Sequence, residues 1–293
     1  MASKSATTDP EKTTDPAKTI AFQGAAGAYS DLACRTVHPD RTPLACASFE
    51  DTFAAVETGR ANLAMLPIEN SEAGRVADIH MLLPHTTLHI VGEHFQRVRH
   101  CLLAPPRATL ASLKHVYSHV QALSQCRAAV HALGLVPVAT MDTAGAAAEV
   151  AGRGDASEAA IASELAAEIY GLAILKRDLE DAERNTTRFV LLARDAPDAP
   201  AGQGKWMTSF IFSVRNVPAA LYKALGGFAT NGVNMLKVES YMVDGSFTST
   251  QFYAEIEGHP EQKNVQLAFD ELGFISREVK VLGVYRADPF REN

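Results

Sequence analysis

Five short polar segments of this chain carry the side chains with which a protein could hold and protonate a small anion. They read GAAGAYS, LPIENS, SHVQALSQC, DTAGAAAEV and NTTRF. The first four follow apolar, strand-like runs, and the fifth opens one. Amides, hydroxyls and the free N–H groups at helix N-termini can bind an anion without the help of a metal ion. The segments therefore predict the walls of a site for an anionic small molecule.

The segment LPIENS places Glu69, Asn70 and Ser71 directly after an apolar strand. Three polar groups would emerge together there, at the end of a strand where ligands of α/β proteins usually bind. The alternative is a plain helix cap formed by Asn70 or Ser71.

The segment SHVQALSQC predicts a helix capped by Ser118. Gln121 and Gln125 follow Ser118 by three and seven residues, so the three side chains would share one helical face. A hydroxyl and two amides on one face indicate a polar pocket wall. A solvated face is the alternative, but the apolar residues between them leave little room for it.

The other three segments are weaker evidence. Tyr29 ends a glycine-rich turn that could equally be a simple connector. Asp142 or Thr143 can cap a helix built from small residues, which would let a ligand approach closely. Thr186 and Thr187 open a strand and therefore point to opposite faces of it.

The elements that must position these side chains alternate between strand-like and helix-like runs from Thr19 onward. One series occupies about residues 19–98, and a second begins near His100 and continues to about residue 186. This alternation predicts βαβ units in two α/β lobes. The run RFVLLAR, at 188–194, arrives after the second series is complete, so this strand could cross back to the first lobe.

A linker and a different kind of domain follow. The stretch 195–205, DAPDAPAGQGK, is rich in Pro and Gly and has no periodicity, as linkers do. Residues 206–288 then show the order βαββαβ, a ferredoxin-like pattern. The chain is thus expected to be an α/β protein with two lobes at 19–194 and a smaller C-terminal domain.

Composition limits the function. A net charge of -7 argues against a nucleic-acid or membrane-surface role, and no apolar run is long enough to span a membrane. The four cysteines are widely spaced and not grouped with histidines, so we expect reduced, buried thiols, no metal site and a cytoplasmic protein. Residues 1–18 are expected to form a disordered tail and not a secretory signal.

Taken together, the motifs resemble the prephenate dehydratase family from about Ile20 to Tyr285. GAAGAYS, LPIENS, HCLLA, SHVQALSQC, DTAGAAA, EIYGL and NTTRF are similar to that family's signatures in order and separation. The resemblance implies a catalytic domain like a periplasmic solute-binding protein, with lobe one formed by about 19–98 plus 187–194 and lobe two by about 99–186. It also implies an ACT regulatory domain at 206–288.

The resemblance implies an activity and a set of residues. The reaction is the decarboxylating dehydration of prephenate to phenylpyruvate, water and carbon dioxide for phenylalanine synthesis, with no cofactor. The residues implied to be catalytic are Thr187, Asn70, Ser118 and Gln125, and Thr187 is the favoured one. Its hydroxyl could donate to the leaving oxygen, act through a relay with Glu69, His119 or water, or stabilise that oxygen by a hydrogen bond alone. The residues expected to bind substrate are Tyr29, Glu69, Ser71, His119, Gln121, Thr143, Arg188 and Phe189.

The ACT resemblance implies feedback inhibition by L-phenylalanine bound at an interface of a homodimer or homotetramer. Its expected contact residues are Ala219, Ala220, Leu221, Asn234, Glu239 and Ser240. The chain departs from the family here, because Ala219 replaces the usual glycine and Tyr241-Met242 replace an Arg-Pro pair. These departures leave the strength of inhibition open.

Two alternatives to this function stay open. Arogenate dehydratase acts on the amino analogue of prephenate, and Glu69 is the acidic side chain that could favour it. A two-lobed sensor that binds an aromatic acid without catalysis is the other alternative.

Overall fold

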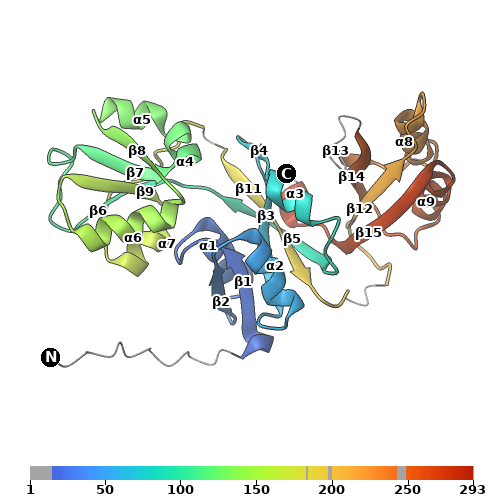
Figure 1. Ribbon diagram of the computed structural model, residues 1–293, viewed down its shortest axis with the longest axis horizontal. Coiled ribbons are helices and arrows are strands. Elements are labelled where there is room, and N and C mark those ends of the chain that lie inside the picture. The colour runs from blue at the N-terminus through green and yellow to red at the C-terminus, as the bar shows by residue number, and fades with distance from the viewer. Residues whose placement is uncertain (1–14, 183, 197–199, 243–248, 293) are drawn as a thin grey trace, which may run out of the picture.

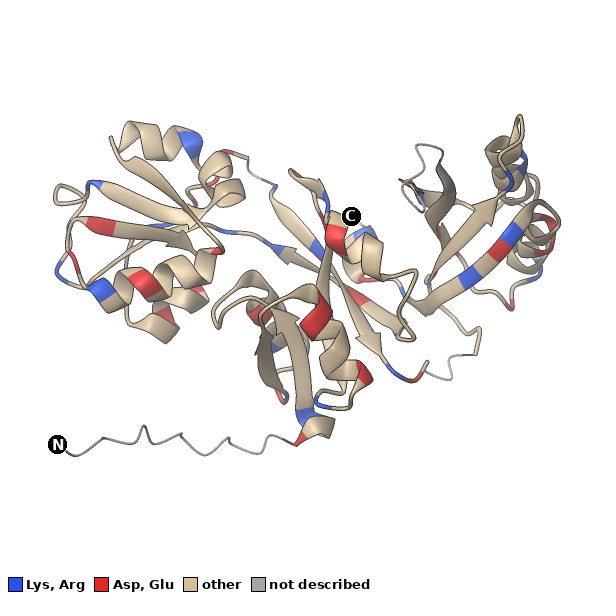
Figure 2. Ribbon diagram, viewed as in Figure 1, with Lys and Arg blue, Asp and Glu red and all other residues tan. Residues whose placement is uncertain are grey.

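The computed structural model describes residues 15–182, 184–196, 200–242 and 249–292. It contains two α/β lobes and a C-terminal domain, which lie side by side along the longest axis of the molecule (Figure 1). Lysine, arginine, aspartate and glutamate are interspersed over all three parts (Figure 2). Among the described residues, no helix has both the length and the apolar character needed to cross a membrane.

Lobe one is built on a sheet with the strand order β2-β1-β3-β11-β5, and β4 pairs with β3. β1 and its two neighbours run parallel, whereas β11 runs antiparallel to both β3 and β5. The elements are β1 (Thr19–Gln23), α1 (Tyr29–Val37), β2 (Thr42–Cys46), α2 (Phe49–Glu57), β3 (Leu63–Asn70), β4 (Gly74–Arg75), α3 (Ala77–Leu82), β5 (His89–Arg97) and β11 (Thr186–Ala193).

Lobe two has the strand order β10-β6-β9-β7-β8. Its elements are β6 (Cys101–Ala104), β7 (His115–His119), α4 (Val120–Gln125), α5 (Arg127–Ala132), β8 (Val136–Thr140), α6 (Thr143–Arg153), β9 (Glu158–Ala162), α7 (Glu164–Tyr170) and β10 (Ala173–Lys176). The prediction of a single helix after Ser118 is wrong, because two short helices, α4 and α5, take its place. Cys126 has φ -116° and ψ 22°, outside helical geometry, and separates α4 from α5.

The C-terminal domain has an antiparallel sheet with the order β13-β14-β12-β15. Its elements are β12 (Trp206–Val214), α8 (Ala220–Thr230), β13 (Met235–Met242), β14 (Ser249–Glu257), α9 (Lys263–Ile275) and β15 (Ser276–Arg286). Phe210, Phe212 and Phe228 form the centre of its core with side chains of both helices. The predicted α/β fold, two lobes followed by a βαββαβ domain, is therefore confirmed.

The segments outside these units are short. Of the expected tail 1–18, residues 1–14 lie outside the described part of the chain, and Pro16–Lys18 form a 3-10 turn. Of the expected linker 195–205, residues 197–199 also lie outside it. Pro289–Glu292 form a second 3-10 turn, in which Phe290 stacks on Phe95 of β5.

The C-terminal domain packs directly on lobe one. Val190 and Leu192 of β11 share one apolar core with Met207 of β12 and Leu282 of β15. Gly283 lies so close to β5 that a Cβ there would meet the carbonyl oxygen of Ile90 at 2.0 Å. Any side chain at position 283 would force the two sheets apart, so this glycine is required by the contact.

A buried cluster of charges crosses the same interface. Arg188 of β11 is 2% exposed, and its guanidinium donates to Glu93 of β5 and Glu255 of β14 at 2.8 Å. It also donates to the Tyr285 hydroxyl at 3.1 Å. Burial raises the pKa of Glu93, but Arg291 and Arg188 outweigh it and hold that pKa below its usual value. Glu93 is therefore ionised and paired at neutral pH.

We predict that Arg188→Met lowers the free energy of unfolding by about 3–5 kcal/mol, because it leaves buried carboxylates without their cation. Urea unfolding at neutral pH measures the loss. Arg99→Met is the matched control, since that side chain is mostly exposed and lies 3.8 Å from Asp178. It should change stability by less than about 0.5 kcal/mol. Equal losses in the two variants would contradict the role given to the buried cluster.

Candidate functional site

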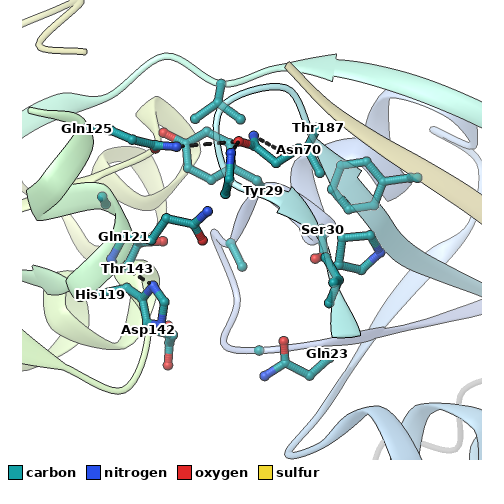
Figure 3. A pocket seen from close by; sticks show the side chains of 18 of the residues that line it. Gln23, Tyr29, Ser30, Asn70, His119, Gln121, Gln125, Asp142, Thr143 and Thr187 are labelled. Atoms are coloured by element: carbon teal, nitrogen blue, oxygen red, sulfur yellow. Dashed lines mark hydrogen bonds between the residues drawn. The ribbon is translucent and has the colours of Figure 1, made fainter. Parts of the chain in front are cut away.

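A cavity of about 530 Å³ lies between the two lobes (Figure 3). β3, β11 and the start of α1 form its lobe-one side. α4 and the start of α6 form its lobe-two side. The polar lining comprises Gln23, Tyr29, Ser30, Asn70, Arg75, His100, His119, Gln121, Gln125, Asp142, Thr143 and Thr187. Phe49 and Phe189 supply aromatic surface.

Asn70 fixes the direction of the Thr187 hydroxyl. The two residues lie opposite each other in the pairing of β3 with β11. The Asn70 side-chain oxygen accepts the backbone N–H groups of Glu72 and Ala73 at 3.0 Å, so the nitrogen must be the atom that faces Thr187. This nitrogen donates to Thr187 Oγ1 at 3.0 Å. Because the oxygen is already an acceptor, the Thr187 proton is free to be donated into the cavity.

Further amides continue this network into lobe two. Asn70 donates to the Asn185 side-chain oxygen at 2.8 Å, and Asn185 donates to Gln125 Oε1 at 3.0 Å. The Gln125 nitrogen lies 3.5 Å from Asn70 Oδ1. The ring of these three amides joins the β3 end to helix α4, across the boundary between the lobes.

His100 and Tyr29 extend the network on its far side. His100 Nε2 lies 3.0 Å from Gln125 Oε1, and Nδ1 lies 3.0 Å from the Tyr29 hydroxyl oxygen. His100 is 2% exposed. Burial lowers its pKa, although Gln125 and Glu180 oppose that shift.

Two helix N-termini lie at the cavity wall. Tyr29 and Ser30 are the first residues of α1, and Thr143 is the first residue of α6. The unpaired N–H groups and the dipole of each helix favour an anion in the cavity. Asp142 caps α6 through a 2.6 Å bond from the Gly145 N–H, which occupies part of its carboxylate. Arg75 is the arginine of the cavity lining and carries a positive charge at any physiological pH. Its side chain is partly exposed.

The structure brings together eight of the residues expected at the site. They are Tyr29, Asn70, His119, Gln121, Gln125, Thr143, Thr187 and Phe189. His119 has a local role as well, because its Nδ1 accepts the Gln121 N–H at 3.3 Å and caps α4.

Four expected residues do not line the cavity. Ser118 is fully buried and donates to the Ile161 carbonyl at 2.6 Å, because β7 continues through His119 and Ser118 stays inside the sheet. Ser71 bonds the backbone of the segment that enters β11. Arg188 and Glu69 form an ion pair at 3.0 Å towards the C-terminal domain, where Lys237 also contacts Glu69.

Sequence reasoning missed several lining residues. Gln23 ends β1 and His100 directly precedes β6, so both are polar residues at the boundary of an apolar strand, the signal that identified Asn70. Phe49 opens α2, and no signal in the sequence distinguishes it from a core residue. Asn185, in the NTTRF segment, does not line this cavity but bonds both Asn70 and Gln125 behind it.

The residues expected to sense an amino acid lie in two places of the C-terminal domain. Ala219, Ala220 and Leu221 lie at the start of α8, and Ala219 has φ +61°, a left-handed conformation that favours glycine. Glu239 and Ser240 lie on β13, where Arg75 Nη1 is 3.4 Å from both the Glu239 carboxylate and the Ser240 carbonyl. Asn234 precedes β13 and donates to Glu257 at 2.9 Å.

Comparison with known proteins identifies the class. The family model described as prephenate dehydratase matches residues 20–197. The chain therefore belongs to the prephenate dehydratase family of hydro-lyases. It is 55% identical to the bifunctional N-acyl-homoserine lactone acylase/prephenate dehydratase of Komagataeibacter europaeus, over 93% of this chain and 97% of that protein.

Other relatives and solved structures agree. The arogenate dehydratase/prephenate dehydratase 2 of Arabidopsis thaliana is 39% identical, over 92% of this chain and 73% of that protein. The structure of prephenate dehydratase in complex with L-Phe from Arthrobacter aurescens has a TM-score of 0.84 at 30% identity, over 92% of this chain and 90% of that one. A structure titled as the quorum-quenching acylase GqqA has a TM-score of 0.88 at 55% identity, over 93% and 99% of the chains.

We predict that Ser118→Ala changes the stability of the protein more than its catalysis. Its loss leaves the buried Ile161 carbonyl without its donor, which costs about 1 kcal/mol of unfolding free energy. Turnover measured well below the melting temperature should stay within about threefold of wild type, since that corresponds to only about 0.7 kcal/mol of barrier. A loss of 100-fold in turnover would show that Ser118 contacts the substrate after all.

Proposed function

We propose that this protein is a prephenate dehydratase that produces phenylpyruvate for phenylalanine synthesis. The observation that carries the proposal is the Thr187 hydroxyl, which Asn70 leaves free to donate into an interlobe cavity of a chain in this family. Prephenate carries two carboxylates and a ring hydroxyl. Its conversion gives phenylpyruvate, water and carbon dioxide and consumes one proton.

The chemistry of the step fits a hydroxyl donor. As the ring C–C bond to the carboxylate breaks, its electron pair enters the ring and the C–O bond to the leaving hydroxyl breaks. The leaving oxygen accepts the Thr187 proton and departs as water. The Thr187 oxygen, held by the Asn70 N–H, regains a proton from solvent. Aromatisation supplies the driving force, so positioning and hydrogen bonding are the main tasks of the protein.

Charge selection follows from the walls. The N-termini of α1 and α6 and the Arg75 guanidinium suit the two carboxylates of the substrate. Phe189 and Phe49 offer apolar surface to its ring. A substrate carboxylate can replace Glu239 as the ion-pair partner of Arg75. The Arg75–Glu239 contact is long, at 3.4 Å, and both side chains are partly exposed.

The same arginine suggests a route for feedback regulation. In our proposal, L-phenylalanine binds the C-terminal domain near the start of α8 and β13, as an effector of a homodimer or homotetramer. The structure of the Arthrobacter aurescens protein in complex with L-Phe supports L-phenylalanine as the ligand. A shift of β13 would reach the cavity through Glu239 and Arg75. Tyr241, which departs from the family pattern, hydrogen-bonds His80 of lobe one and ties the same strand to the catalytic domain.

The cavity residues can be compared with the needs of two other substrates. Arogenate needs an acidic partner for its ammonium group, and Glu69 does not fill that role because it pairs with Arg188 and Lys237 outside the cavity. Asp142 is the carboxylate that does line the cavity. An N-acyl-homoserine lactone is suggested by the activities named for the 55% identical relative. Acyl transfer uses a nucleophile paired with a base. Among the described cavity residues, the hydroxyl that contacts a histidine is that of Tyr29, so Tyr29 with His100 is the pair that such a reaction would use.

The direct test measures product formation from each substrate by the purified protein. Ultraviolet detection of phenylpyruvate follows prephenate, amino-acid analysis follows arogenate, and release of homoserine lactone follows the acylated lactone. We expect turnover of prephenate, with the rate lowered by millimolar L-phenylalanine. Turnover of arogenate alone would replace the proposed substrate, and tight prephenate binding without product would indicate a sensor.

We predict that Thr187→Val lowers kcat by roughly 100-fold or more, the usual effect of deleting one transition-state donor. Valine keeps the shape of threonine, so the cavity wall keeps its form. Thr187→Ser is the matched control and should retain turnover within about tenfold, because its hydroxyl is restored. The assignment of Thr187 as donor fails if the valine variant turns over prephenate within about twofold of wild type.

We predict that Arg75→Gln raises KM for prephenate about tenfold, about 1.4 kcal/mol of binding, with a smaller effect on kcat. Glu239→Gln, which removes the competing carboxylate, should leave KM unchanged or lowered and weaken inhibition by L-phenylalanine. Steady-state kinetics with and without the effector measure both. An unchanged KM in the Arg75 variant would remove this residue from the carboxylate site without touching the role of Thr187.

A further inference from the structure

Both ring nitrogens of His100 face oxygen atoms that can accept a hydrogen bond. Nε2 lies 3.0 Å from Gln125 Oε1, and Nδ1 lies 3.0 Å from the Tyr29 hydroxyl oxygen. A neutral imidazole carries one proton and can donate to only one of them. Which contact is satisfied depends on the orientation of the surrounding groups, and the network fixes that orientation.

The amide orientations on the Nε2 side follow from backbone donors that cannot be reversed. Two backbone N–H groups donate to Asn70 Oδ1, so the Asn70 nitrogen is the atom that faces Asn185. Because this nitrogen is a donor, the Asn185 atom that it faces must be the side-chain oxygen. The Asn185 nitrogen then donates to Gln125, whose facing atom must be its oxygen. That same oxygen faces His100 Nε2, so Nε2 has to carry a proton.

The Nδ1 side has a competing acceptor. The single Tyr29 hydroxyl proton lies within reach of the Arg99 carbonyl oxygen, which is 2.7 Å away and nearer than His100 Nδ1. If that proton goes to Arg99, the Tyr29 oxygen needs a donor from Nδ1. A neutral His100 therefore leaves one acceptor without a proton, whereas a doubly protonated ring satisfies every contact.

Burial opposes the doubly protonated, charged form of His100. His100 is 2% exposed, and burial lowers its pKa. The titratable groups around the ring and its Tyr29 partner are Tyr29 of α1, Glu180 ahead of β11, and the buried thiols Cys101 and Cys126. Glu180 opposes the effect of burial, and its carboxylate accepts the His100 backbone N–H at 2.8 Å. The cavity wall therefore holds a position for a second proton on His100, which the contacts favour and desolvation disfavours.

We propose that His100 takes up a proton when an anionic ligand enters the cavity, and so couples substrate binding to pH. The inference rests on the proposed function, because prephenate supplies two negative charges in the cavity that His100 lines. An anion favours the charged ring and raises its pKa in the complex. Binding is then tightest below the pKa of the free protein and weakens as pH rises towards the pKa of the complex.

The first test needs no turnover. The protein is labelled at histidine with 15N and titrated by NMR with and without saturating phenylpyruvate, an unreactive aromatic anion. The His100 signals are assigned as those missing from His100→Gln. We expect protonation at Nε2 in the neutral state and a pKa at least one unit higher in the complex, so that Kd rises about tenfold across that window. An unchanged pKa, or a neutral ring protonated at Nδ1, would overturn the proposal.

Paired variants test the consequence for prephenate. The amide of His100→Gln can reach the position of Nε2 and donate to Gln125, but it cannot become charged. Its kcat/KM should lose the decline that we expect of wild type as the pH rises through the His100 pKa of the free protein, which burial holds below its ordinary value. His100→Asn places its amide near the position of Nδ1, so it cannot donate to Gln125. Its kcat should be lower than that of His100→Gln by tenfold or more, because Gln125 loses this hydrogen bond. His131→Gln, at an exposed position, is the control.

The outcomes separate the two proposals. Wild-type turnover of prephenate with the same pH profile in His100→Gln would reject the role of His100 and leave the dehydratase intact. A purely structural His100 would lower the melting temperature in both variants without changing the pH slope. If wild type neither turns over prephenate nor binds phenylpyruvate, both proposals are wrong.

Discussion

The alternation of side chains along β11 is the constraint on which the rest of the structure depends. Successive residues of a strand point to opposite faces, so Thr187 and Phe189 face the interlobe cavity while Arg188 and Val190 face the C-terminal domain. A charge on that second face is tolerable only because carboxylates from β5 and β14 meet it. The catalytic wall and the docking surface are thus two sides of one strand, and neither can shift without the other.

Much of this arrangement could be predicted because it follows from local order along the chain. The strand 188–194 comes after lobe two is complete, so a return to lobe one was the economical path, and β11 does pair with β3 and β5. The polar ends of β3 and the start of α6 lie at the cavity because carboxyl ends of parallel strands meet at one edge of a sheet. Such rules place Asn70 and Thr143 without any knowledge of packing.

The side chains whose placement differs from the expectation are those whose tertiary contacts decide it. Ser118 has the same local pattern as a capping residue, but the neighbouring strand β9 offers it the Ile161 carbonyl, and no spacing in the sequence reveals that partner. Glu69 and Arg188 face away from the cavity because another domain covers that side of the sheet. The role of His100 cannot be read from the sequence, because a histidine beside an apolar strand is ambiguous until both of its ring partners are known.

The low formal charge of the cavity agrees with the proposed reaction. Its lining holds one arginine and one capping aspartate, and the remaining polar contacts are amides, hydroxyls and imidazoles. The reaction converts a dianion into a monoanion and neutral carbon dioxide, so negative charge at the departing carboxylate disappears in the transition state. Fixed cations around that carboxylate would stabilise the ground state more than the transition state and slow the step. Neutral donors such as Thr187 avoid that penalty while still admitting the substrate.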